Sequence, residues 1–146
     1  MKLNIATGLK EYEITDERGD VKCVVCFNPT DPGFAEKLYN VFSQLDKKDE
    51  EYHKMANEDT DNVHLFEMAR QMDAEMRQMI DNVLGAEVCK PLFGSVSVYA
   101  WADGLPLWAN LLLSLMDEMD EALAREKKAS DPRLKKYTEK FKNKAG

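Results

Sequence analysis

The chain has 146 residues, of which 44% are hydrophobic and 32% are charged, so it is long enough to fold as one domain around a buried core. Its longest apolar stretch, at residues 108–116, is interrupted by Asn110 and Ser114, which excludes a bilayer-spanning helix of about 20 apolar residues. The first residues lack the apolar core of a signal peptide and the cysteines are odd in number, so we expect a cytoplasmic protein with free thiols.

The net charge of −7 is unevenly distributed along the chain. Residues 125–146 contain nine Lys or Arg against three acidic residues and carry +6, so residues 1–124 carry −13. A strongly acidic body repels nucleic acid and anionic lipid. The basic end is compatible with RNA or DNA, with the acidic body of its own chain, or with an acidic neighbouring protein. We therefore expect other proteins as partners, with nucleic acid the less favoured class and no membrane partner.

Residues 1–28 have the alternating apolar and polar pattern of β-strands. The alternation occurs in three runs, at residues 3–5, 12–14 and 21–27. The polar turn at residues 16–20 contains a glycine that is free to take positive φ, which predicts an antiparallel hairpin between the second and third runs. Because the third run is apolar on both faces, we expect it to be central in a sheet or covered.

After these runs the pattern changes from the two-residue repeat of a strand to the repeat of a helix. Asp31 is the expected cap of a helix over residues 32–56, which begins with a proline. Residues 57–60 are expected to end this helix and to cap the next, over residues 60–84, which closes at Gly85. The apolar stripes of the two helices are Phe34, Leu38, Val41, Phe42, Leu45, Tyr52 and Met55, and then Leu65, Met68, Ala69, Met72, Met76, Met79, Ile80 and Val83.

Residues 86–104 predict a short helix followed by an irregular or strand-like segment, because proline and glycine interrupt them. The strongest amphipathic pattern covers residues 104–128, and we expect residues 103–106 to begin that helix. A cap and a proline at residues 130–132 predict a last short helix. The residues expected to face the core are Trp108, Leu111, Leu112, Leu115, Met116, Met119, Ala122 and Leu123 in the first of these helices, and Leu134, Tyr137 and Phe141 in the last.

Together these elements predict a single α+β domain over residues 1–146 that is predominantly α-helical. A small N-terminal antiparallel β element at residues 1–28 precedes a bundle of about four helices. The helical body is expected at residues 31–128, and residues 129–146 form a basic C-terminal helix or tail.

No set of residues has the spacing of a catalytic, cofactor-binding or metal site, so we expect a protein that is not an enzyme and needs no cofactor. Cys23 and Cys26 have the C-x-x-C spacing, but residues three apart in a strand point to opposite faces, so we interpret them and Cys89 as core residues. Residues 50–53 have the E-x-x-H spacing that di-iron bundles use, and residues 61–64 have a D-x-x-H spacing. Both segments lie among polar residues, away from the apolar stripes that face a bundle core. A solvated helix face explains them better.

Methionine is the feature that points to a binding surface. The candidate partner-binding residues are Met68, Met72, Met76 and Met79 on one predicted helix, and Met116 and Met119 on another. Methionine is unbranched and adaptable, so it fills gaps in cores and is also over-represented on surfaces that bind varied apolar segments. Core packing is the favoured interpretation of these residues, and a groove for apolar segments of a partner is the second.

Several segments resemble a family of small, largely uncharacterised proteins of phages and prophages of Gram-positive bacteria. They are residues 88–94 (VCKPLFG), 98–99 (VY), 102–108 (ADGLPLW) and 116–120 (MDEMD), together with 28–31 (NPTD), 34–35 (FA), 128–134 (KASDPRL) and 136–137 (KY). The likeness covers most of the chain after residue 28.

The resemblance implies a siphophage tail assembly chaperone, which coats the long tape-measure protein, keeps its apolar segments soluble and hands it to polymerising tail-tube subunits. It implies the bacterial host cytoplasm as the location, and tape-measure and tail proteins as partners. We also expect a homo-oligomer, because a large exposed apolar patch rarely stays unpaired. A structural tail or head-completion component of the phage particle is the alternative function.

Overall fold

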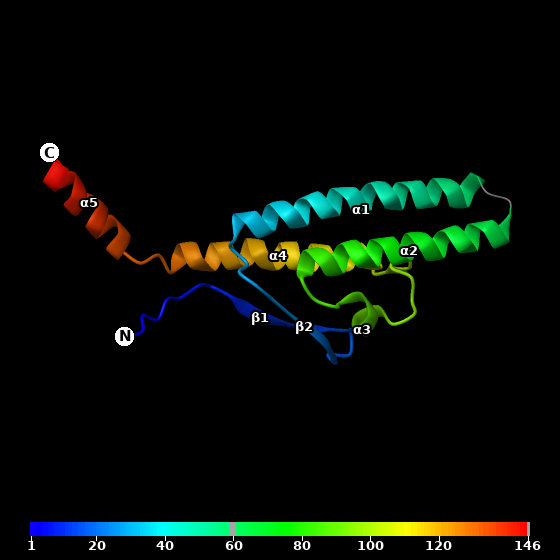
Figure 1. Ribbon diagram of the computed structural model, residues 1–146, viewed down its shortest axis with the longest axis horizontal. Coiled ribbons are helices and arrows are strands. Elements are labelled where there is room, and N and C mark those ends of the chain that lie inside the picture. The colour runs from blue at the N-terminus through cyan, green and yellow to red at the C-terminus, as the bar shows by residue number, and fades with distance from the viewer. Residues whose placement is uncertain (59–60, 146) are drawn as a thin grey trace.

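The structure is a computed structural model that describes residues 1–58 and 61–145 (Figure 1). These residues form, in chain order, β1 (Lys10–Thr15), β2 (Val21–Phe27), α1 (Pro32–Glu58), α2 (Asn62–Leu84), α3 (Cys89–Phe93), β3 (Trp101–Ala102), β4 (Leu105–Pro106), α4 (Leu107–Lys128) and α5 (Arg133–Ala145). The predicted class is confirmed: the protein is α+β and predominantly helical, with a small antiparallel sheet near the N-terminus. No helix in the described part of the chain is both long and apolar enough to cross a membrane.

The core lies between three long helices. Helix α1 packs against both α2 and α4, and Figure 1 shows it on one side of these two helices, with the β1–β2 hairpin and α3 on the other. The side chains with no exposed surface include Leu38 and Leu45 of α1, Met76 and Ile80 of α2, and Leu112 of α4. They repeat at helical spacing along each sequence, so the apolar stripes predict which faces meet.

The predicted N-terminal hairpin is confirmed. Strands β1 and β2 are antiparallel, with Tyr12 opposite Val25. Asp16 accepts hydrogen bonds from the backbone of Arg18 and Asp20, which closes the turn between the strands. Phe27 stacks on Tyr12 of the neighbouring strand, with 4.8 Å between the ring centroids, and on Phe34 in the first turn of α1 at 4.7 Å, so the second contact joins the hairpin to α1.

Two predictions for the N-terminal segment are wrong. Residues 1–9 form neither strand nor helix, although residues 3–5 alternate, because a strand needs a hydrogen-bonding neighbour as well as a pattern. Strand β2 is not covered on both faces, since Val24 and Cys26 are exposed while Val25 and Phe27 are buried. The sheet has two strands, so one face of β2 packs on the helices and the other remains on the surface.

The start of α1 and the end of α2 agree with the sequence, whereas the boundary between these two helices differs. Asp31 caps α1 by accepting a hydrogen bond from the backbone N–H of Gly33 at 2.8 Å, and Gly85 ends α2 with the positive φ of 65° that favours glycine. The cap of α2 is Asp61, which accepts from the backbone of two following residues, and not a residue of the predicted segment 57–60. Helix α1 continues through Glu58, and residues 59–60 lie outside the described part of the chain.

Helix α4 begins at Leu107, later than predicted. Asp103 and Gly104 form the turn of a small hairpin between β3 and β4, with φ values of 53° and 82°. Positive φ at both central residues defines the tight hairpin turn for which Asp-Gly is the preferred sequence. Asp103 and Gly104 therefore form the turn of a hairpin, although the amphipathic pattern predicts that a helix begins at residues 103–106.

Three charged side chains of α2 fix the segment that follows it. Asp73 accepts a hydrogen bond from the backbone of Val98 at 2.8 Å, and Arg77 donates to the backbone carbonyl of Val96. Asp81 accepts from the backbone N–H groups of both Val88 and Cys89, at 3.0 and 3.1 Å. These α2 residues are four apart, so they form one row along the helix and hold an otherwise irregular segment against it.

The last helix does not join the bundle. Leu134, Tyr137 and Phe141 were expected to face the core, but they are 79%, 50% and 72% exposed. In Figure 1, α5 lies beyond the end of α4 and points away from the other helices. The expectation that these three residues face the core is therefore wrong, and residues 129–145 form a projecting arm.

Candidate functional site

The six candidate methionines divide between the core and its margin. Met72, Met76, Met116 and Met119 are buried, whereas Met68 and Met79 are half-buried. Met72 and Met76 lie among the core residues of α2, so they do not offer a surface to a partner in this conformation. For these two residues the structure agrees with core packing, the interpretation that the sequence favours.

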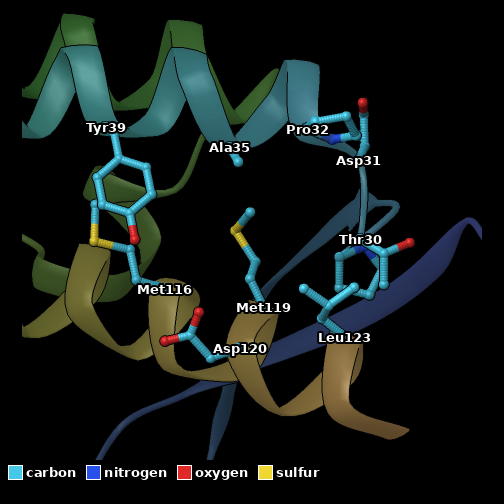
Figure 2. Close-up of a pocket in the computed structure, with 10 residues that line it drawn as sticks. Thr30, Asp31, Pro32, Ala35, Tyr39, Met116, Met119, Asp120 and Leu123 are labelled. Carbon is cyan, nitrogen blue, oxygen red and sulfur yellow. The ribbon is translucent and has the colours of Figure 1, made fainter. Parts of the chain in front are cut away.

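Met116 and Met119 have a second role, because they also line a groove between α1 and α4. The groove has a volume of about 220 Å³. Figure 2 shows Ala35 and Tyr39 of α1 on one side of it and Met116 and Met119 of α4 on the other. The lining residues are Pro29, Thr30, Asp31, Pro32, Ala35, Tyr39, Met116, Met119, Asp120 and Leu123.

The loop at one end of the groove is held by local hydrogen bonds. The side-chain oxygen of Asn28 accepts from both the backbone N–H and the hydroxyl of Thr30, each at 2.8 Å. The backbone of Asp31 then donates to the Asn28 carbonyl, and its side chain caps α1. The turn and the cap together fix where α1 starts, at the end of the groove that Pro29 and Thr30 line.

The rim of the groove is apolar and partly open to solvent. Tyr39 is 56% exposed and Leu123 is 44% exposed, although both are large apolar side chains next to a buried helix face. Among the described residues that line it, Asp31 and Asp120 are the charged ones, and none is Lys or Arg. An apolar cleft with an acidic rim is suited to apolar side chains of a neutral or basic segment.

A second, wider hollow of about 940 Å³ lies between the hairpin, the segment after α3 and α4. Its lining is more polar and includes Tyr12 and Glu118. Burial raises the pKa of the Tyr12 phenol to about 12, and the neighbouring Glu118 carboxylate adds to the rise. A phenol with a pKa raised in this way stays protonated at neutral pH and is a poor general base.

The residues with metal-like or redox-like spacing are separated or have structural partners. Cys26 is exposed on the outer face of β2, which corrects its interpretation as a core residue, while Cys23 is half-buried on the inner face. His53 lies 3.3 Å from Asp49, its neighbour one helical turn earlier, and Asp61 caps α2. Among the described residues, no three His, Cys, Asp or Glu side chains come together as metal ligands.

We therefore expect EDTA and a thiol reductant to leave the melting temperature unchanged. Cys89 is buried beside Asp81, and burial first and that carboxylate second raise the pKa of its thiol well above the usual range. A protonated, buried thiol neither binds metal nor exchanges readily. Thermal denaturation followed by circular dichroism, with and without each reagent, tests the expectation; a fall of about ten degrees would contradict it, since that corresponds to more than 1 kcal/mol.

Sequence reasoning missed part of the groove. Leu123 belongs to the predicted apolar face of its helix, but Tyr39 lies beside the predicted stripe of α1 and Pro29 precedes the helix. Their proximity depends on how α1 crosses α4, which no local pattern specifies.

Comparison of this chain with protein families, with curated proteins and with solved structures finds no match.

Proposed function

We propose that this protein is a non-enzymatic, chaperone-like protein that binds apolar helical segments of a client in the groove between α1 and α4. The observation that carries the proposal is the groove itself, lined by Met116 and Met119 and edged by exposed Tyr39 and Leu123. The resemblance of the sequence to siphophage tail proteins supports the tape-measure protein as the client. The site of action is then the cytoplasm of the bacterial host.

The chemistry of the groove suits many related segments better than one specific ligand. Two methionines supply flexible, polarisable contacts that adapt to side chains of different shape. Tyr39 adds a large ring with a polar end at the rim, a combination that is common where proteins bind one another. An amphipathic helix of the client can place apolar residues at i, i+3 or i+4 in such a groove.

The acidic surface supports the same role. Residues 1–124 carry a net charge of −13, and the two charged groups in the groove lining are acidic. A protein that covers apolar segments of a long client must keep the complex from aggregating, and a high net charge of one sign provides that repulsion. Basic residues beside the apolar face of a client segment would be attracted to the same surface.

The test is to replace Tyr39 and Leu123 singly by aspartate and to measure retention of a co-expressed tape-measure protein. Each loses an apolar contact of about 1.5–3 kcal/mol when buried by the client, so we expect binding to fall about tenfold or more. Because both side chains are largely exposed, we expect the melting temperature to stay within a few degrees of the wild-type value.

Phe66→Asp is the matched control. Phe66 is an aromatic residue of α2 with 59% exposure, close to that of Tyr39, but it does not line the groove. Retention of the client by Phe66→Asp and its loss in Tyr39→Asp would support the groove as the site. Equal loss in both variants would show a general surface effect, and a well-folded wild-type protein that never retains the client would contradict the proposal. Presence of the protein in purified particles would favour the structural alternative.

A further inference from the structure

We infer that α5 of one copy docks in the α1/α4 groove of a second copy, so that two chains exchange their C-terminal arms. This inference rests on the proposed function in one respect, because it assigns to the groove an occupant with the chemistry of a client. The groove and the arm lie at the same end of the molecule, since Leu123 in the groove is separated by only a few residues from the end of α4 at Lys128.

The arm has the amphipathic face that the groove requires. Leu134, Tyr137 and Phe141 are spaced at i, i+3 and i+7, so they lie along one face of α5, and all three are exposed. An isolated helix of 13 residues is marginal in water, because helices shorter than about 12–15 residues rarely form without packing. A helical α5 therefore needs a surface that covers this apolar face.

Charge indicates which surface that is. Helix α5 contains six Lys or Arg and one acidic residue, whereas residues 1–124 carry −13. The groove offers an apolar lining with Asp31 and Asp120 at its edge, and no basic side chain of the described part of the chain lines it. An arm with an apolar face and basic flanks is complementary to this groove in both respects.

The direction of α5 favours the groove of a second copy over that of its own chain. Asp131 accepts a hydrogen bond from the backbone N–H of Arg133 at 2.9 Å and pairs with its guanidinium at 2.8 Å. Pro132 restricts Asp131 to an extended conformation, so the chain leaves α4 without reversing. The cap moves with α5 in either case, so the direction of the arm is what differs. Docking on a partner keeps the direction in which α5 leaves α4, whereas docking on its own groove requires α5 to fold back along α4 (Figure 1).

Reciprocal exchange also provides enough buried surface. A two-fold axis near the ends of the two α4 helices places each arm over the groove of the other chain, as in other arm exchanges. Tyr137 and Phe141 are 50% and 72% exposed, so burying their exposed parts together with Leu134 in both arms covers roughly 600–800 Å² on the arm side. The groove surfaces that they cover bring the total into the range of about 1,200–2,000 Å² for stable interfaces.

The experiment uses sedimentation equilibrium of the full chain and two kinds of variant. Leu134→Asp with Phe141→Asp disables the arm, and Leu123→Asp disables the groove. We expect a wild-type dimer, and at least a tenfold weaker self-association for either variant. An equimolar mixture of the two should form a heterodimer, because the intact arm of one chain meets the intact groove of the other. Phe66→Asp should dimerise like the wild type.

Other outcomes would overturn the inference. A wild-type monomer at every concentration, or a mixture of the two variants that stays monomeric, would exclude arm exchange and leave docking on the same chain. A dimer that persists in both variants would place the interface elsewhere.

A peptide of residues 130–146 separates this inference from the proposed function. It should bind the arm-disabled variant, whose groove is free, and not Leu123→Asp. If two copies exchange their arms but the protein never retains the tape-measure protein, the proposed function alone is refuted. Retention of the tape-measure protein by a strictly monomeric chain would refute the arm exchange alone.

Discussion

Replacing Met76 by aspartate is expected to unfold the protein. Met76 has no exposed surface and lies in the core between the long helices. Truncating a buried methionine costs about 2–5 kcal/mol, and a carboxylate in the same place adds the cost of an unpaired buried polar group, about 1–3 kcal/mol. A domain of this size has a total stability of about 5–15 kcal/mol, so the variant should lose cooperative thermal unfolding or melt far below the wild type.

The matched variant is Met68→Asp, on the same helix and with the same chemical change. Met68 is half-buried, so its new carboxylate can reach water, and we expect a much smaller loss of stability. Chemical denaturation followed by circular dichroism compares the two variants directly. If Met76→Asp folds as well as the wild type and only client binding is lost, then the methionines of α2 form a surface and the core described above is incorrect.

The sequence predicts the fold well where local rules determine it. The hairpin turn at residues 16–20, the Asp31 cap with its following proline, and Gly85 at the end of α2 are each set by one or two residues. The buried residues of α1, α2 and α4 follow from helical spacing, because each helix exposes one face to water and buries the other.

The errors arise where long-range packing decides the outcome. An amphipathic face shows that Leu134, Tyr137 and Phe141 need a partner, but it does not show whether that partner is the same chain. Residues 3–5 alternate like a strand, but within residues 1–58 and 61–145 no strand lies beside them. Long-range packing also creates the groove. Tyr39 and Leu123 are distant in sequence, and they line the same groove only because α1 crosses α4.

The methionines show why the candidate site was only partly predictable. Sequence periodicity places Met72, Met76, Met116 and Met119 on inward faces, but it gives no measure of how completely each is covered. All four are buried, yet Met116 and Met119 also line the groove, because α1 covers α4 less completely near the C-terminal end of α4. A side chain can therefore belong to the core and still form the floor of a binding site.

Asp81→Ala is the second change expected to have a large effect, although Asp81 has no part in the groove. Its side chain accepts hydrogen bonds from the backbone of Val88 and Cys89, which are 0% and 1% exposed. Without the carboxylate, these two N–H groups are unpaired as long as they remain buried, at a cost of about 2–6 kcal/mol in total. We expect a lower midpoint in chemical denaturation and local opening of the segment between α2 and α3.

The Cys89 thiol reports that opening. In the wild type, burial and Asp81 raise the pKa of Cys89, so the thiol stays protonated and reacts slowly with a thiol reagent. In Asp81→Ala the substitution removes the carboxylate and the opening removes the burial, so the pKa returns towards its ordinary value and the sulfur is exposed. The reaction should then be at least tenfold faster than in the wild type. Cys26 is exposed in both proteins and should react at the same rate in each.

Two further variants separate the hydrogen bonds from the charge. Asp81→Asn keeps a side-chain oxygen that can accept from both N–H groups, so it should retain most of the stability. Glu87→Ala removes an exposed carboxylate from the same segment and should change the stability by less than about 0.5 kcal/mol. If Asp81→Asn were as unstable as Asp81→Ala, the negative charge would be the stabilising element. If Asp81→Ala left Cys89 unreactive, then packing alone would hold the segment, and the row of charged side chains on α2 would not be what fixes it.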